Sequence, residues 1–207
     1  MRRNIAQSPS DSKPELRREL CLRRNNLSIR TRTNLDCAIQ QQVLQLAIEQ
    51  KAQSVACYWP FNGEPDIIPV CRQLMANDCE LALPVVSGKD DHLMSFYSWR
   101  QNTNLIKNRY GICEPEKSTL QPVSGFDMLI MPLVGYDRFG NRLGMGAGYY
   151  DRHLELLRHS DIPLRVGIAY SLQKIDPIEK NSWDIPLHGV VNEHGWFTFG
   201  GSLALES

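Results

Sequence analysis

The spacing of apolar residues predicts two helices in the first quarter of the chain. Residues 1–12 are polar and predict a flexible N-terminal tail. Residues 13–28 place leucines at helical spacing among many arginines, which is typical of an amphipathic helix with one basic face. Helical spacing resumes over residues 35–50, and Thr33 and Asp36 stand at the positions of a capping box, so we expect the second helix to begin there.

Beyond residue 53, short apolar runs that end at turn residues predict strands. They cover residues 54–60, 81–86, 92–99, 127–137, 164–170 and 196–199. Helical spacing over residues 67–75 and 149–159 separates some of them, while residues 101–125 are polar and rich in turn formers. Strands that alternate with helices predict an α/β fold, a single-domain layered sandwich whose mainly parallel sheet has helices on both faces. We expect this one domain to cover residues 13–207.

Composition excludes several classes of protein. The 207 residues are 42% hydrophobic and 22% charged, which is enough apolar content for a globular core. Lys plus Arg and Asp plus Glu both number 23, so a broadly basic surface for nucleic acid is not expected. No apolar run approaches the roughly 20 residues of a membrane helix, and the N-terminus lacks a signal-peptide core. We therefore expect a cytoplasmic monomer with neither nucleic-acid nor membrane partners.

The cysteines predict neither a metal site nor a disulfide framework. No two of them form a C-x-x-C pair, and their spacing fits no zinc knuckle or ribbon. A chain of this length without a leader does not need disulfides for stability. We expect free and mostly buried thiols at Cys21, Cys37, Cys57, Cys71, Cys79 and Cys113.

A glycine-rich segment between the strand at 127–137 and the helix at 149–159 is the first candidate for chemistry. Gly140, Gly144, Gly146 and Gly148 fall within nine residues. Glycines let the backbone adopt positive φ and approach a ligand closely. The N–H groups of the helix that follows favour an anion at its N-terminus. The segment is therefore a candidate phosphate-binding loop.

Charged residues beside these glycines strengthen that interpretation. Arg138 and Arg142 lie on either side of Gly140, ahead of the other three glycines, and could clamp phosphate oxygens. Asp151, just inside the helix, could hold a hard cation such as Mg²⁺. The alternative is a flexible loop with a few tight turns. The chain has no G-x-x-x-x-G-K-[ST] P-loop, and G-M-G-A-G-Y does not match the dinucleotide-binding G-x-G-x-x-G.

The run NRLGMGAGYYDRHL resembles the signature of the 5-formyltetrahydrofolate cyclo-ligase family, also called methenyltetrahydrofolate synthetases. The segments KPELR, YWPFNGEPD, YGICEP, MLIMPLVGYD and WDIPL resemble other parts of the same family in the same order. The resemblance covers roughly residues 13–195, and the glycine–YYD segment is its most specific part.

The resemblance implies an ATP-dependent enzyme that closes 5-formyltetrahydrofolate into 5,10-methenyltetrahydrofolate, with ATP as co-substrate and Mg²⁺ as cofactor. The formyl oxygen would attack the γ-phosphate, N10 of the folate would attack the activated carbon, and phosphate would leave. Such a protein must hold the formyl oxygen in line with the triphosphate and neutralise its charge. No protein nucleophile is required.

The resemblance also implies roles for individual residues. ATP binding falls to Lys13, Arg17, Arg142, Gly144, Met145, Gly146, Ala147, Gly148, Tyr149 and Tyr150. Folate binding falls to Trp59, Glu64, Met145, Gly146, Ala147, Gly148 and Tyr149. Catalysis falls to Arg142, Tyr149 and Tyr150, and the metal to Asp151 and Asp184. Glu64 would accept two N–H donors of the pterin ring, and Trp59 would form an apolar wall beside it.

Without the family resemblance, several of these residues would also suit purely structural roles. Lys13 and Arg17 would suit an ordinary solvated helix face, and Glu64 and Asp184 would suit turns. Two positions depart from the family pattern, because His188 stands where many members have an acid and Asn192 where many have Thr.

Two other functions stay in view. A non-catalytic folate- or nucleotide-binding storage protein would bind both ligands without releasing phosphate. A sugar-phosphate isomerase could use a glycine-rich anion loop on the same kind of sheet without needing ATP.

Overall fold

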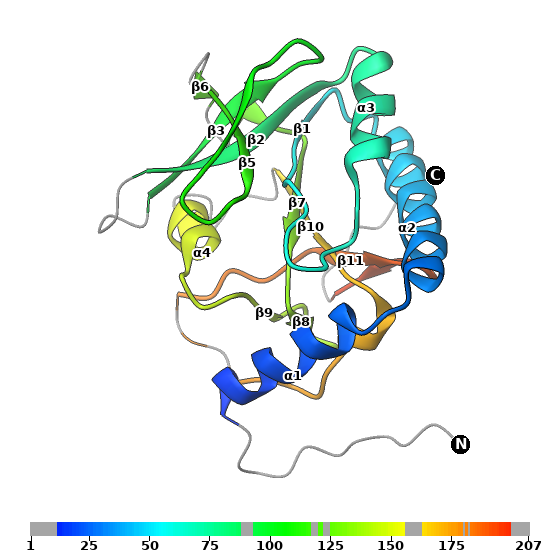
Figure 1. Ribbon diagram of the computed structural model, residues 1–207, viewed down its shortest axis with the longest axis vertical. Helices are drawn as coiled ribbons and strands as arrows, with labels where there is room; N and C mark the ends of the chain where they lie inside the picture. Colours follow the sequence, from blue (N-terminus) through cyan, green and yellow to red (C-terminus); the bar gives the residue numbers. More distant parts are fainter. Residues whose placement is uncertain are drawn as a thin grey trace.

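The computed structural model describes residues 12–87, 93–116, 120–121, 125–155, 163–179, 181 and 183–199. Residues 1–11 of the tail predicted at 1–12, and residues 156–159 of the helix expected at 149–159, lie outside the described residues, and Ser12 is the N-cap of the first helix. Figure 1 shows a twisted sheet with helices packed against it. No helix in the described ranges combines the length and apolar character that crossing a membrane requires.

The main sheet has eight strands in the order β12-β11-β10-β7-β1-β2-β3-β6. In chain order they are β1 (Ser54–Ala56), β2 (Glu80–Ser87), β3 (Leu93–Trp99), β6 (Leu120–Gln121), β7 (Met128–Pro132), β10 (Leu164–Ile168), β11 (Gly189–Asn192) and β12 (Gly195–Thr198). The five strands from β11 to β2 are parallel, and β12, β3 and β6 pair antiparallel at the two edges. The predicted mainly parallel sheet and the final edge strand are confirmed.

Helices cover both faces of this sheet, as the sequence predicts. On one face, α2 (Ile29–Glu49) and α3 (Ile68–Ala76) pack Ile39, Val43 and Leu74 against apolar residues of the central strands. On the other face, α4 (Tyr149–Leu154) buries Leu154 beside Phe96 of β3. The parallel strands are buried from both sides, which explains the continuous apolar run in β7.

The second helix begins earlier than the sequence predicts. Ser28 is the N-cap of α2, and its hydroxyl accepts a hydrogen bond from the backbone N–H of Thr31 (3.1 Å). Thr33 therefore lies inside the helix, where its hydroxyl donates to the carbonyl of Ile29 (3.0 Å). Asp36 is buried and accepts a hydrogen bond from the Tyr170 hydroxyl (2.6 Å). The expected capping box at Thr33 and Asp36 is wrong because both side chains have other partners.

The polar segment at 101–125 contains a hairpin that its composition does not predict. Strands β4 (Leu105–Lys107) and β5 (Cys113–Pro115) pair antiparallel around a turn at Gly111. A second small hairpin, β8 (Gly135–Tyr136) and β9 (Arg142–Leu143), follows β7. Strands of two or three residues carry too few positions for a period to be visible.

All six cysteines are free, as expected. Cys57, Cys71 and Cys79 are buried, whereas Cys37 is exposed and the other two are half-buried. The expectation of mostly buried thiols therefore applies to three of the six. A side-chain hydrogen bond with Cys71, and then burial, raise the pKa of the Cys57 thiol well above its usual range.

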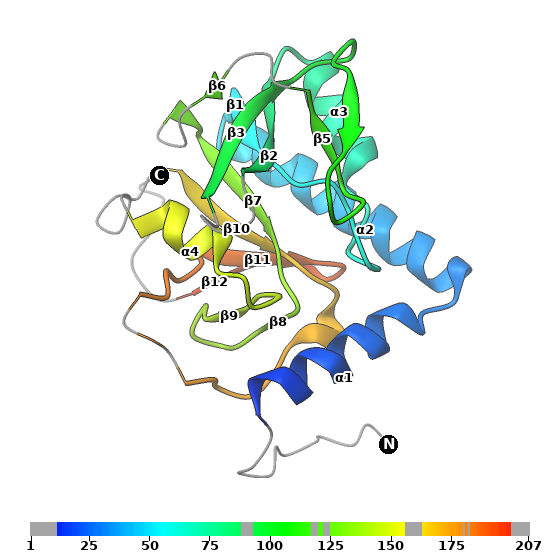
Figure 2. The ribbon, with the colours of Figure 1, turned by 60° about the vertical axis from the view of Figure 1, so that its left-hand side comes forward.

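The strand order changes direction between β1 and β7, and this fixes where a ligand can bind. From β1 the chain continues to β2 on one side, whereas from β7 it continues to β10 on the other. Loops that leave two neighbouring parallel strands in opposite directions open a crevice at their carboxyl ends. The helix α1 (Lys13–Asn25) lies across this end of the sheet, beside β8 and β9 (Figures 1 and 2).

Candidate functional site

The glycine-rich loop leaves β9 and enters α4 at the carboxyl end of β7. Gly146 has φ +102° and Gly148, the N-cap of α4, has φ +66°. Both values lie in the left-handed region that side chains with a Cβ avoid. Gly144 has no positive φ, so two of the three alternating glycines have the expected backbone conformation. The loop is shaped by backbone geometry that only glycine adopts freely.

Arg142 joins this loop to the segment that carries Asp184. Its Nη2 donates to Asp151 Oδ1 at 2.5 Å, and its Nη1 donates to the carbonyl oxygen of Ile185. Asp151 Oδ1 also accepts from the backbone N–H of Ile185 (3.4 Å). The structure therefore brings Arg142, Asp151 and the residue that follows Asp184 together, as the resemblance implies.

Helix α1 reaches the same loop through Arg17. The Arg17 Nε donates a hydrogen bond to the carbonyl oxygen of Gly144 (2.7 Å). A Cβ at Gly146 would lie 3.5 Å from the Arg17 guanidinium carbon, so the loop passes close to this side chain. Lys13 is half-buried one helical turn earlier on the same face. Arg17 is thus a contact of the loop rather than part of an ordinary solvated face.

Glu64 lies in a tight turn that follows β1. Asn62 and Gly63 have φ +49° and +74°, and Glu64 Oε2 accepts a hydrogen bond from the backbone N–H of Phe61 (3.0 Å). The turn is held from α1, where Arg24 Nε donates to the carbonyl of Asn62 (2.9 Å). Glu64 is thus a turn residue, and its side chain is also nine-tenths buried.

The environment of Glu64 changes its acidity. Burial raises the pKa of the Glu64 carboxyl to about 7, although the charge of Arg24 and the Phe61 N–H oppose the shift. The pKa of the Tyr150 hydroxyl is also raised, mainly by burial and then by the nearby charge of Glu64. The charge of Arg142 opposes this shift. Groups from the loop after β1 and the loop after β7 therefore interact across the crevice. Perturbed acids in a crevice mark candidate functional sites.

Trp59 lies between β1 and the Glu64 turn. It is half-buried and packs edge-to-face on Trp99, with ring centroids 5.9 Å apart and planes inclined by 70°. This contact gives an apolar surface next to the turn, and the role of Trp59 beside a folate ring stays a prediction.

Tyr149 is held by Arg109 and Tyr110, to which the sequence assigns no role. Arg109 Nη2 donates to the Tyr149 hydroxyl (3.0 Å), and the hydroxyls of Tyr110 and Tyr149 lie 3.2 Å apart. Arg109 also lies over the Tyr110 ring at 4.8 Å. Both come from the turn of the β4–β5 hairpin. The segment YGICEP, which begins at Tyr110, is part of the family resemblance, but only the fold brings this turn to α4.

The proposed metal ligands are oriented by their neighbours. Asp184 Oδ2 accepts from the backbone N–H and the side-chain amide of Asn181 (2.8 and 3.2 Å). Asp151 uses Oδ1 for its bonds to Arg142 and Ile185. Across the described ranges, no cluster of three His, Cys, Asp or Glu side chains is suited to hold a metal alone.

Three further positions have structural partners. His188 Nδ1 accepts from the backbone N–H of Arg165 (2.9 Å), and Asn192 Nδ2 donates to the hydroxyl of Tyr136 (3.0 Å). Arg138 is exposed, with its guanidinium over the Phe139 ring at 4.8 Å. Its role as a clamp for phosphate oxygens stays a prediction.

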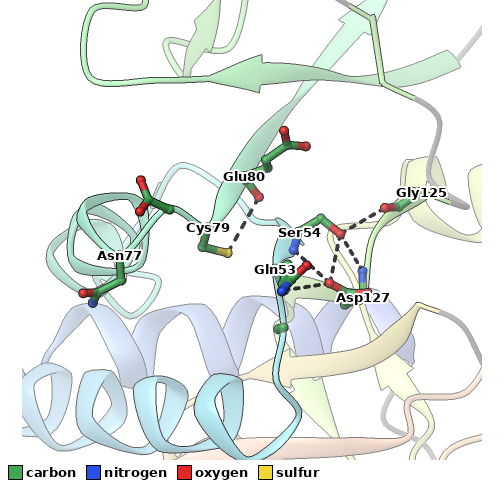
Figure 3. Close-up of a pocket in the computed structure, with 9 residues that line it drawn as sticks. Gln53, Ser54, Asn77, Cys79, Glu80, Gly125 and Asp127 are labelled. Carbon is green, nitrogen blue, oxygen red and sulfur yellow. Dashed lines mark hydrogen bonds between the residues drawn. The ribbon is translucent and has the colours of Figure 1, made fainter.

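A separate pocket of about 570 Å³ opens at the opposite end of the strands (Figure 3). Its lining includes Ser54, Glu80 and Asp127, which stand at the amino ends of β1, β2 and β7. Asp127 Oδ2 accepts hydrogen bonds from Gln53 N (2.7 Å), Ser54 N (2.9 Å) and Ser54 Oγ (3.1 Å). This carboxylate therefore ties strands together, and the pocket is distinct from the crevice.

The model of the 5-formyltetrahydrofolate cyclo-ligase family matches residues 9–193. The chain belongs to this family. The cyclo-ligase of Haemophilus influenzae is 29% identical over 184 residues, covering 88% of this chain and 98% of the relative. The cyclo-ligase of Escherichia coli K12 is 37% identical over 142 residues, covering 68% of this chain and 78% of the relative.

Solved structures of the family share the fold. The 5,10-methenyltetrahydrofolate synthetase of Aquifex aeolicus superposes with a TM-score of 0.79 at 33% identity, covering 94% of this chain and 96% of the other. The synthetase of Mycoplasma pneumoniae gives 0.71 at 25% identity, covering 88% and 99%. The cyclo-ligase family inferred from the glycine–YYD segment is confirmed, and with it the α/β architecture.

Proposed function

We propose that the protein is an ATP-dependent 5-formyltetrahydrofolate cyclo-ligase that works in the crevice between the loops after β1 and β7. The observation that carries the proposal is the juxtaposition of a glycine loop flanked by Arg17 and Arg142 with a buried carboxylate at Glu64. A triphosphate and a pterin ring need these two kinds of partner. Family membership supports the same reaction and gives no support to a sugar-phosphate isomerase.

The reaction needs two bond exchanges in one site. The formyl oxygen attacks the γ-phosphorus of ATP, and ADP leaves as the bond to the bridging oxygen breaks. N10 then attacks the former formyl carbon, loses its proton, and phosphate departs with the formyl oxygen. In-line phosphoryl transfer depends on positioning and charge stabilisation, so the protein supplies cations and backbone N–H groups rather than a nucleophile.

The chain's own residues divide these tasks. Lys13, Arg17 and the loop N–H groups bind the triphosphate, and Arg142 stabilises the charge that develops during transfer. Glu64 accepts N–H groups of the pterin, and Trp59 lies against the ring. Tyr149 and Tyr150 exclude water beside the formyl group.

Asp151 and Asp184 fit a Mg²⁺ site that phosphate oxygens complete. Hydrogen bonds from the described residues occupy one oxygen of each carboxylate, and Asp151 bonds to the neighbour of Asp184. Carboxylate oxygens shared with substrate phosphates are the usual ligands of this ion. When bound, Mg²⁺ neutralises charge on the triphosphate.

Absorbance in the methenyl-folate band tests the proposal after protein, Mg-ATP and 5-formyltetrahydrofolate are mixed. We expect the band to grow only when both ATP and Mg²⁺ are present. Binding of both ligands by calorimetry without growth of the band would refute the enzyme and favour the storage protein.

A further inference from the structure

Arg24 is the buried cation of this crevice that the sequence does not single out. Its side chain is fully buried, whereas Arg23, the adjacent residue of α1, is partly exposed and pairs with Glu19. Positions 13, 17 and 24 follow one face of an α-helix, since steps of four and seven residues return to the same side. Arg24 therefore continues the strip formed by Lys13 and Arg17 toward the Glu64 turn.

The Arg24 guanidinium connects three segments of the crevice. Its Nε donates to the carbonyl of Asn62 (2.9 Å), and its Nη1 donates to the carbonyl of Leu133 at the end of β7 (3.2 Å). Its Nη2 lies 3.8 Å from Glu64 Oε1 and has no hydrogen-bond partner among the described residues. A buried charged donor without a hydrogen bond is costly, so a nearby carboxylate is its natural counter-charge.

The Glu64 turn leaves little freedom around this contact. Arg32 Nη1 donates to the carbonyl of Gly63 (2.8 Å), and its Nη2 donates to the carbonyl of Arg24 (2.6 Å). A Cβ at Gly63 would lie 2.1 Å from Asn25 Oδ1, so α1 and the turn are in close contact. The turn that presents Glu64 is thus built against the C-terminal half of α1.

We propose that Arg24 is a positioning residue for the folate subsite, which fixes the Glu64 turn to the end of β7 and supplies the counter-charge of the Glu64 carboxylate. The same helix contacts the glycine loop through Arg17, two turns earlier. Helix α1 therefore sets the spacing between the carboxylate that receives the pterin and the loop that receives the triphosphate. The inference rests on the proposed function for its link to folate.

Several groups face Glu64 and determine its charge. Arg24 faces it from α1, the Phe61 N–H from its own turn, Tyr150 from α4 and Tyr58 from the end of β1. Arg24 is the cation in this set. A carboxylate that accepts two pterin N–H groups must be ionised, so loss of Arg24 should weaken folate binding most at the acid end of the pH range and least at alkaline pH, where Glu64 is ionised in both proteins.

Arg24→Met, with Arg23→Met as the matched control, tests the proposal. We measure the Glu64 titration by carboxyl ¹³C NMR, assigned with Glu64→Gln, and the KM values for folate and ATP between pH 6 and 9. For Arg24→Met we expect the Glu64 pKa to rise by about one unit and the folate KM to rise about tenfold at pH 7. The ATP KM and all values of Arg23→Met should stay within about twofold of wild type.

Arg24→Lys keeps the positive charge but not the planar hydrogen-bonding geometry of Arg24. It also provides a second test if Arg24→Met does not fold. It should keep the Glu64 pKa close to that of wild type and still raise the folate KM, because an ammonium cannot reproduce the planar fork. An unchanged folate KM together with an unchanged Glu64 titration in Arg24→Met would overturn the proposal. An unchanged folate KM in Arg24→Lys, or equal rises of the folate and ATP KM values in either variant, would also overturn it. If the wild type forms no methenyl-folate, the proposed function fails, while the titration still decides whether Arg24 is the counter-charge.

Discussion

Burial of Glu64 gives the protein a pH-dependent stability that belongs to a single residue. The carboxyl has a pKa of about 7 in the folded chain against 4.5 for an unperturbed glutamate. A raised acid pKa means that the protonated form favours folding. Its contribution is complete below about pH 4.5 and is lost as the pH rises through about 7.

Glu64→Gln should remove this dependence. Between pH 4.5 and 8 we expect the free energy of unfolding of the wild type to fall relative to the variant by on the order of 3 kcal/mol. Urea denaturation at several pH values gives the difference directly. A constant difference across this range would show that Glu64 titrates normally.

Arg142 is the residue on which we expect charge stabilisation to depend. It lies against Asp151 and Ile185 at the end of the glycine loop. Arg142→Ala should lower kcat about a hundredfold or more, since a fixed cation at the transferring phosphoryl group is removed. Arg30→Ala, at an exposed arginine of α2 outside the site, is the control and should keep its kcat. Unchanged turnover of the Arg142 variant at saturating ATP would contradict its role.

Asp151 should affect the metal requirement more than the fold. Asp151→Asn keeps the shape of the side chain and can still accept a hydrogen bond from Arg142, but it loses the charge that attracts Mg²⁺. We expect half-maximal activity at a Mg²⁺ concentration about tenfold higher, measured at fixed ATP. A titration identical to that of wild type would remove Asp151 from the metal site.

At the scale of elements, α2 shows why a start signal can mislead. Two polar residues at capping spacing, Thr33 and Asp36, are visible in the sequence, yet Ser28 caps the helix. Asp36 owes its place to Tyr170, more than a hundred residues away, and no local pattern contains that contact.

Ser28→Ala should therefore destabilise the protein by about 1 kcal/mol, because one N–H of the first turn loses its acceptor. Thr33→Ala, inside the exposed part of the helix, should cost less than about 0.5 kcal/mol. Chemical denaturation of both variants makes the comparison. A larger loss of stability in Thr33→Ala than in Ser28→Ala would show that the helix begins at Thr33, as the sequence predicts.

Short elements mark the limit of sequence reasoning about the site. The strands and helices with clear periods were predicted within a few residues, and β7 was visible as an apolar run. The β4–β5 hairpin was not, although its turn brings Arg109 and Tyr110 to Tyr149. Arg24 resembles its arginine neighbours in the sequence, and only packing against the Glu64 turn distinguishes it.

At the scale of the whole molecule, the order of the strands determines where the candidate site lies. Adjacent parallel strands β1 and β7 send their loops apart, so a carboxylate from one and an anion loop from the other share a crevice. Helix α1 spans both. The family resemblance names the residues, while the topology explains why we expect segments distant in the sequence to act together.

The proposed phosphoryl transfer is tested most directly by following the formyl oxygen into the phosphate that is released. With 5-formyltetrahydrofolate carrying ¹⁸O in the formyl group, we expect one ¹⁸O atom in the phosphate for each methenyl-folate formed, measured by mass spectrometry of phosphate from a single turnover. The attacking oxygen remains bonded to phosphorus when N10 closes the ring. Phosphate without ¹⁸O, released together with methenyl-folate, would contradict phosphoryl transfer to the formyl group.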